Sequence, residues 1–200
     1  MYSLGDGERL VKAARQAIEL NLLSPRFRRE MLGRYLDGFD ANEGVFVTLE
    51  HYVTGEPRGS MGVVSQELPL GSALIDAAVF AATNDPVHIP VSHQELEHVV
   101  VRVSVLTDMK QIKAKTEQSL KREIKPGTNG LSITSGFHGA VMLPWETPGQ
   151  RRNAEDILSS LCEKAGLQGN AWRSQGVELY KFHAQTFKEL YPGDSVEEIR

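Results

Sequence analysis

The amino-acid sequence predicts an α+β fold built mainly from antiparallel sheets. Two observations support this prediction: short strand patterns rich in valine, and amphipathic helix patterns that separate them without a regular strand–helix–strand alternation. A parallel sheet would need that alternation, because each parallel connection requires a crossover. The length of 200 residues suits one domain, or one domain divided into two lobes.

Helices and a hairpin are expected in the first third of the chain. Asp6 can cap a first helix, and Pro25 ends it because proline cannot continue the helical hydrogen-bond ladder. A second, short helix is expected over residues 27–36. The strand pattern of residues 45–53 then predicts a hairpin with residues 58–64, across a turn that leaves the register open.

The middle of the chain combines an alanine-rich helix with the strongest strand pattern. Pro69 fits the first turn of a helix over residues 70–80, whose small residues predict close packing on a sheet. Ser92 and Glu95 have the spacing of a capping box, which predicts a short helical turn. Residues 98–106 are apolar at most positions, so we expect a central strand there.

The last third predicts further helices and short strands. Gly166 is the expected stop of its longest helix, and Cys162 falls on the apolar face of that helix, where we expect it to be inert. The expected elements are, in order, a loop from residue 108, a helix from about residue 116, a turn at 125–130, strands at 131–134 and 140–144, a helix at 153–165 and a strand at 177–187.

Composition and charge exclude several classes of protein. No apolar run approaches the roughly 18 residues of a membrane span, and the N-terminus lacks the pattern of a signal peptide. The single cysteine excludes a disulfide within the chain and an iron–sulfur cluster, so we expect a cytoplasmic protein without a cofactor. The net charge of −4 argues against a nucleic-acid footprint, although residues 26–34 and 110–125 are basic. We expect both basic runs to be solvated helix faces, so nucleic-acid binding is the weakest functional hypothesis.

The most informative segment is residues 58–62, Arg-Gly-Ser-Met-Gly. Its glycines lack the Cβ atoms that would keep a ligand or another backbone at a distance. Arg58 either holds a carboxylate or phosphate, or forms an internal ion pair with Asp85 or Glu56. Ser60 is either a candidate nucleophile or part of a tight strand bend, and its glycines do not have the spacing of a nucleophile elbow.

A second candidate segment follows the alanine-rich helix. Asp85 and Pro86 form a common turn pair, so Asp85 is either a helix stop or a residue of a binding cleft near Arg58. The ligand-binding candidates are therefore Arg58, Gly59, Ser60, Met61, Gly62, Asn84 and Asp85.

Two histidines join Ser60 as candidate catalytic residues. His138 lies in a glycine-flanked turn and His183 lies on the last strand; an unperturbed histidine titrates near neutral pH and suits acid–base chemistry, although an exposed strand histidine often has no such role. His93 and His98 are five residues apart and match neither spacing of the two-histidine zinc motifs. We therefore expect no metal site.

Taken together, these segments resemble the AMMECR domain family. The family signature Arg-Gly-Cys-Ile-Gly is matched with Ser60 in place of cysteine and Met61 in place of isoleucine. In the segment that resembles Asp-Pro-Arg-Phe-Pro-Pro, Val87 and His88 replace arginine and phenylalanine. The matches run in order from about residue 10 to residue 189, including residues 58–62, 84–91, 103–107, 139–144, 161–167, 171–172 and 179–189.

The resemblance implies two unequal lobes, each a mainly antiparallel sheet with flanking helices, and a cleft between them. The larger lobe would hold roughly residues 1–80 and 140–190, and the smaller lobe roughly residues 81–139. Residues 191–200 would form a flexible acidic tail.

Two functional hypotheses follow. In the first, the protein is a regulatory module whose Arg58–Ser60 loop binds a ligand or a protein partner at the cleft; the resemblance implies Memo-like and radical-SAM proteins as associated partners. In the second, it is an enzyme acting on a small anionic substrate at the same cleft, with relatives using a cysteine at the position of Ser60. Serine removes that thiol chemistry, and the remaining glycines and arginine are typical of a recognition loop, which favours the first hypothesis.

Overall fold

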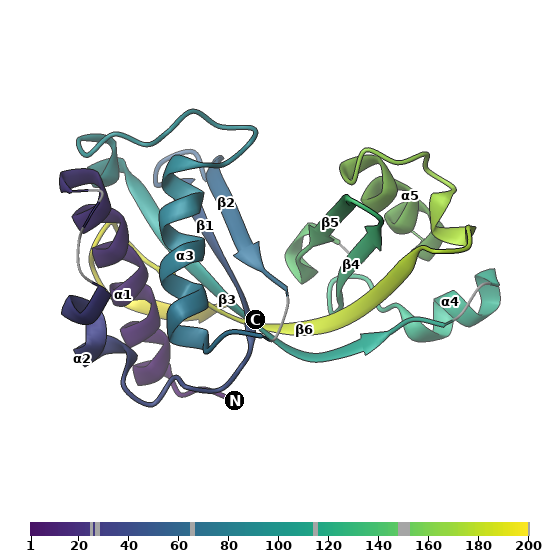
Figure 1. Cartoon of the computed structure of the whole chain (residues 1–200), viewed down its shortest axis with the longest axis horizontal. Coiled ribbons are helices and arrows are strands. Elements are labelled where there is room, and N and C mark those ends of the chain that lie inside the picture. Colours follow the sequence, from purple (N-terminus) through teal and green to yellow (C-terminus); the bar gives the residue numbers. More distant parts are fainter. Residues whose placement is uncertain (25, 27–28, 65–66, 114–115, 148–152, 200) are drawn as a thin grey trace. The chain divides into compact units, whose positions relative to one another are not determined.

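The computed structural model describes residues 1–24, 26, 29–64, 67–113, 116–147 and 153–199, and it confirms the α+β class. Two compact units make up the chain: unit 1 is Met1–Leu106 with Gln185–Arg200, and unit 2 is Thr107–Ala184. The long strands β3 and β6 pass from one unit into the other (Figure 1). The unit boundaries thus fall inside two strands, whereas the resemblance implies lobe boundaries near residues 80 and 140.

Unit 1 consists of a sheet with helices packed against it. β1 pairs with β2 and with β3, both antiparallel, and β6 pairs with β7. Helix α3 packs on β1 and β2 and also against α1. The elements are α1 (Leu4–Leu23), α2 (Gly33–Leu36), β1 (Gly44–His51), β2 (Pro57–Val63), α3 (Leu70–Thr83), β3 (Val99–Gln111), β6 (Glu178–Glu189) and β7 (Val196–Ile199), with 3-10 turns at Arg29–Leu32 and Glu95–His98.

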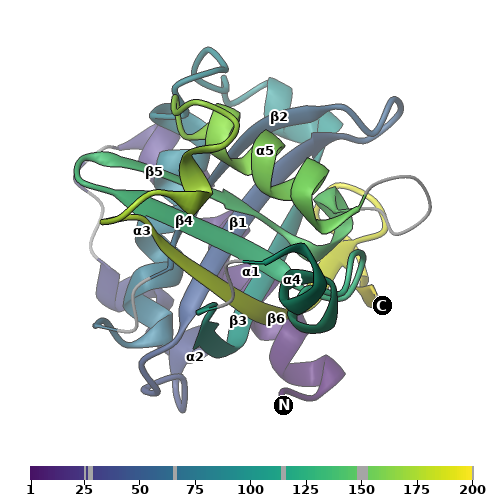
Figure 2. The same ribbon diagram turned by 90° about the vertical axis from the view of Figure 1, so that its right-hand side faces the viewer.

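Unit 2 has a hydrophobic core of its own. β4 pairs antiparallel with both β5 and β6, and α5 packs against β4 and β5 (Figure 2). The buried side chains of Leu120, Leu131 and Leu161 belong to a core cluster that shares no residue with that of unit 1. The elements are α4 (Glu117–Glu123), β4 (Gly130–Ser135), β5 (His138–Met142) and α5 (Ala154–Lys164), with 3-10 turns at Pro144–Glu146 and Ala171–Arg173.

Side-chain caps fix the start of three helices. Ser3 is the N-cap of α1 and forms a capping box with Asp6, so Asp6 lies in the first turn and not at the cap position expected from the sequence. Thr116 and Asn153 cap α4 and α5 in the same way. Each cap satisfies backbone N–H groups that have no partner within the helix.

Two elements differ from the expectation at the ends of strands. β3 continues to Gln111, where a loop from residue 108 was expected, and Asp108 adopts a positive φ of 54° within it. Residues 196–199, expected in a flexible tail, form β7, in which Val196 is buried opposite Glu189. The extension of β3 depends on pairing with β6, which is distant in the sequence. In contrast, β7 pairs with the preceding strand, with Val196 only seven residues after its partner Glu189.

Parts of the two basic runs lie outside the described residues, namely Phe27 and Arg28 in the first and Ala114 and Lys115 in the second. Pro25, the expected end of the first helix, also lies outside them. Among the residues that the structure does describe, no helix is long and apolar enough to cross a membrane.

Candidate functional site

The two glycines of the segment at residues 58–62 permit close packing of β2. A Cβ atom on Gly59 would lie 2.1 Å from the carbonyl oxygen of Ala81, in the last turn of α3. One on Gly62 would lie 2.4 Å from the ring of Phe46 and from the carbonyl oxygen of Val45. The sequence predicted that a ligand or another backbone approaches these glycines. On both sides of the strand the approaching group is the protein's own backbone.

Arg58 forms an internal ion pair. Its guanidinium donates to both carboxylate oxygens of Glu95, with Nη2 at 3.0 Å from Oε2, and Nη1 donates to the carbonyl oxygen of Ile89 at 2.6 Å. The hydrogen bonds and charge of Arg58 hold the pKa of Glu95 below its usual range. The alternative partners expected from the sequence, Asp85 and Glu56, are not the ones that this ion pair uses.

Asp85 joins β2 to the loop that follows α3. Its side chain is 7% exposed, and it accepts hydrogen bonds from the backbone N–H groups of Ser60 (2.7 Å), Val87 (2.7 Å) and His88 (2.9 Å). His88 Nδ1 lies 3.0 Å from the same carboxylate. Burial tends to raise the pKa of Asp85, but these hydrogen bonds outweigh it and the pKa is lowered.

The hydroxyl of Ser60 faces β1 and pairs with another hydroxyl. Ser60 Oγ lies 2.9 Å from Oγ1 of Thr48, its partner in the strand register. Asp85, which pairs with His88, accepts a hydrogen bond from the backbone N–H of Ser60 and not from the Ser60 hydroxyl. In a serine nucleophile the histidine would instead accept the proton of the hydroxyl. The contacts of Ser60 are therefore those of a strand residue.

The remaining candidates in unit 1 have structural contacts as well. Asn84 is the C-cap of α3, where its N–H donates to the carbonyl oxygen of Phe80. Met61 packs partly buried against the hydrophobic core of unit 1. The turn at Asn84 and Asp85 thus ends the helix, as one of the two sequence interpretations proposed.

The loop at residues 84–91 is held at both ends and exposes two aliphatic side chains. Asp85 binds its first turn, Arg58 binds its later carbonyl groups, and the N–H of Val91 donates to the carbonyl oxygen of Ala82 at 2.8 Å. Between these anchors Val87 is 81% exposed and Ile89 is 79% exposed. Figure 1 shows this segment at the top of unit 1, beyond the end of α3.

Sequence reasoning missed Glu95 as the partner of Arg58. The capping-box pattern correctly places Glu95 at the short turn after Ser92, where the Glu95 N–H donates to the Ser92 hydroxyl at 3.2 Å. The same carboxylate also accepts hydrogen bonds from the guanidinium of Arg58, which lies 37 residues earlier in the chain. A signal was available, since a buried arginine needs an acidic partner, but spacing alone does not select one among several acids.

The two candidate histidines of unit 2 lie in different surroundings. His138 is exposed at the start of β5, with Nδ1 3.2 Å from the carbonyl oxygen of Ala165 at the end of α5. His183 lines a cavity together with Lys110 and Lys181. Among the residues described in the structure, no group of three or more His, Cys, Asp or Glu side chains is placed to hold a metal ion.

Comparison with known proteins identifies the family. The AMMECR1 family model matches residues 11–187. The chain belongs to the AMMECR1 family. Protein MJ0810 of Methanocaldococcus jannaschii is 36% identical over 98% of this chain and 96% of its own length, and a protein of Methanosarcina acetivorans is 37% identical over 99% of each chain. The crystal structure of the uncharacterized protein PH0010 from Pyrococcus horikoshii covers 97% of this chain, with 33% identity, a TM-score of 0.87 and 96% of its own chain covered.

In this AMMECR1-family protein, the segment that resembles the family signature therefore supports a neighbouring loop. Gly59 lets β2 approach α3, and Arg58 and the Ser60 N–H bind the loop directly or through Asp85. Two of the segments that carry the family resemblance, residues 58–62 and 84–91, are thus one structural assembly in unit 1.

Proposed function

We propose that this protein is a partner-binding regulatory module whose recognition element is the loop at residues 84–91. The observation that carries the proposal is the exposure of Val87 and Ile89 on a backbone anchored by Asp85 and Arg58. Binding residues lie disproportionately on loops that a rigid scaffold positions, and Val87 and Ile89 are two residues apart on such a loop. Because the loop is already held in place, less conformational entropy is lost when a partner binds it.

The contacts of the signature segment favour binding over catalysis at this place. The Arg58 guanidinium is occupied by Glu95 and by loop carbonyl groups, so an anionic substrate would have to displace them. The Ser60 hydroxyl pairs with Thr48 and has no histidine as its base in these contacts. A regulatory role through protein contact does not require these contacts of Arg58 and Ser60 to be broken.

The test compares affinities for purified Memo-like and radical-SAM proteins of the same organism, which the family resemblance implies as first partners. The double variant Val87→Ser/Ile89→Ser removes the exposed aliphatic groups without touching the anchors. Each buried methylene contributes about 0.8 kcal/mol, so we expect an affinity loss of tenfold or more in calorimetric titrations.

The matched control is Val53→Ser, which removes a 79%-exposed valine from the turn after β1. This control should bind like the unmodified protein. Equal affinities for the double variant and the control, with a partner that binds the unmodified protein, would exclude the loop as the recognition element.

A further inference from the structure

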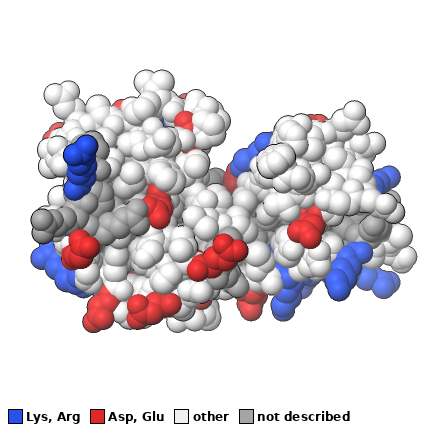
Figure 3. Space-filling view, in the orientation of Figure 1, with Lys and Arg blue, Asp and Glu red and all other residues white. Residues whose placement is uncertain are grey.

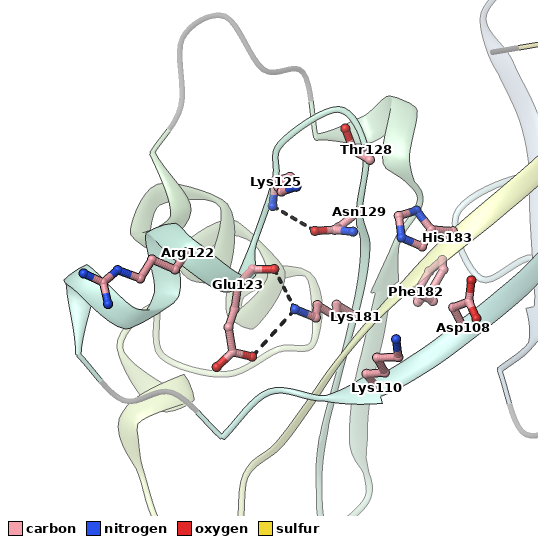
Figure 4. A pocket seen from close by; sticks show the side chains of 10 residues that line it. All are labelled: Asp108, Lys110, Arg122, Glu123, Lys125, Thr128, Asn129, Lys181, Phe182 and His183. Carbon is pink, nitrogen blue, oxygen red and sulfur yellow. Dashed lines mark hydrogen bonds and ion pairs between the residues drawn. The ribbon is translucent and has the colours of Figure 1, made fainter.

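A cavity in unit 2 is lined by basic side chains from three elements. It measures about 330 Å³, which falls in the range of small-molecule sites. Lys110 comes from β3, Lys125 follows α4, and Lys181 and His183 come from β6 (Figure 4). Residues up to 73 positions apart in the sequence thus place their basic groups around one space.

The charge around this cavity is unbalanced, although the chain as a whole is acidic. Three lysines line it against two acids, Asp108 and Glu123, and Figure 4 shows the guanidinium of a further lining residue, Arg122, directed away from the others. Lys181 Nζ is fixed by the carbonyl oxygen of Glu123 at 2.9 Å, with its carboxylate at 3.8 Å. Lys110 and Lys125 are exposed. Figure 3 shows Lys and Arg side chains gathered on the side of unit 2 where Figure 1 places α4.

Neutral hydrogen-bonding groups complete the lining. Asn129 is 6% exposed, and its Oδ1 accepts the backbone N–H of Lys125 at 2.8 Å, which fixes the orientation of the amide. Figure 4 shows the amide nitrogen of Asn129 on the side of His183. Thr128 adds a hydroxyl. These groups match a ligand that has a polar organic part besides its charge.

From this geometry we propose that the cavity binds a small ligand that carries a phosphate group. A phosphate monoester bears nearly two negative charges at neutral pH, which the ammonium groups of Lys110, Lys125 and Lys181 in the lining can balance. Lysine ammonium groups bind such a dianion as point charges from several directions. The cavity is larger than one phosphate group, so the remainder of the ligand lies against Thr128 and Asn129.

The test titrates the full-length protein with inorganic phosphate and with glycerol 3-phosphate at constant ionic strength, followed by amide NMR. Saturable shifts should appear in the backbone amides of residues 108–110, 125–130 and 181–183. Glycerol 3-phosphate should bind several-fold tighter than inorganic phosphate, because it also contacts the neutral groups. If the shifts are absent or do not saturate, the proposal is overturned. This titration uses the unmodified protein, so its outcome does not depend on whether a variant folds.

Variants test the charge directly. The double variant Lys110→Gln/Lys125→Gln should weaken glycerol 3-phosphate binding roughly tenfold or more, since each change removes a charge-assisted contact. The control Lys113→Gln makes the same kind of change at an exposed lysine of unit 2 that is not among the lining residues, and it should stay within about twofold. Equal weakening by the control would show a diffuse charge effect and contradict a built site. Displacement of glycerol 3-phosphate by a single-stranded oligonucleotide, with a steep salt dependence, would replace the proposal by a nucleic-acid surface.

Discussion

At the scale of single residues, the signature segment combines two kinds of constraint. Gly59 is required by the backbone of α3, whereas Arg58 is held by charge and hydrogen bonds. The sequence alone predicted that something approaches the glycines and that Arg58 has an acidic or anionic partner. It could not name Ala81 or Glu95, because these contacts join residues distant in the chain.

Replacing Gly59 by alanine should destabilise unit 1 strongly. The new Cβ would lie 2.1 Å from the Ala81 carbonyl oxygen, so β2 or α3 must shift. We expect a loss of more than about 2 kcal/mol in chemical denaturation. The control Gly33→Ala has open space around its Cβ and should change stability by less than about 1 kcal/mol. Similar losses for both variants would contradict the close packing.

Replacing Ser60 by alanine should have a small effect. The variant loses one hydroxyl pair with Thr48 but keeps the backbone N–H that binds Asp85. We expect a loss of about 1 kcal/mol in denaturation and unchanged partner affinity in titration. A large loss of partner affinity at unchanged stability would show that the Ser60 hydroxyl takes part in partner binding.

The pH dependence of stability should report on Asp85. Its folded-state pKa lies below the ordinary 3.8, so its contribution is present above about pH 3.8 and is lost as the pH falls through the folded pKa. The variant Asp85→Asn should therefore be less stable at pH 7 by about 1–3 kcal/mol. Denaturation curves from pH 7 to pH 3 should show this difference shrinking below about pH 4. A difference that stays constant over this range would show that the charge of Asp85 does not stabilise the fold.

At the scale of helices and strands, local chemistry predicted the elements that depend on nearby residues. The capping-box pattern placed the turn after Ser92, the expected starts of α4 and α5 agree with the structure, and the hairpin of β1 and β2 is present. The extension of β3 to Gln111 and the pairing of β7 with β6 were missed. The extension of β3 pairs with β6, which is remote in sequence. β7 pairs with the nearby end of β6, but its four residues are too few and too acidic to give a clear strand pattern.

The loop at residues 84–91 shows the same division between local and distant contacts. Its turn at Asp85 was predictable from the residue pair with Pro86, and the exposure of Val87 and Ile89 was not. Apolar residues in a loop can be buried or exposed, and the sequence does not distinguish the two. In the structure, hydrogen bonds from Arg58 and to Asp85 hold the loop in a conformation that exposes both side chains.

At the scale of the whole molecule, the two units have separate cores. Family membership and the α+β class were predictable because matching segments run along nearly the whole chain. The basic cavity of unit 2 was not, since its lining is assembled from three elements that are distant in sequence. The interlobe cleft implied by the family resemblance stays a prediction.

Separate cores predict separate responses to a core mutation. Leu161 is fully buried in the core of unit 2, and Leu161→Ala should cost about 2–5 kcal/mol there. Hydrogen exchange should then lose protection in β4, β5 and α5, while the protection of α1, α3 and β1 is retained. An equal loss in both units would show that they unfold as one cooperative structure.

The central claim is that the loop at residues 84–91 is the surface that a partner contacts. The most direct measurement places a photo-crosslinking amino acid at position 87, and at position 53 as a control, in the full-length protein mixed with its purified partner. We predict crosslinked complex from position 87 and only background from position 53. Background crosslinking at position 87 at partner concentrations that saturate the complex would contradict the claim.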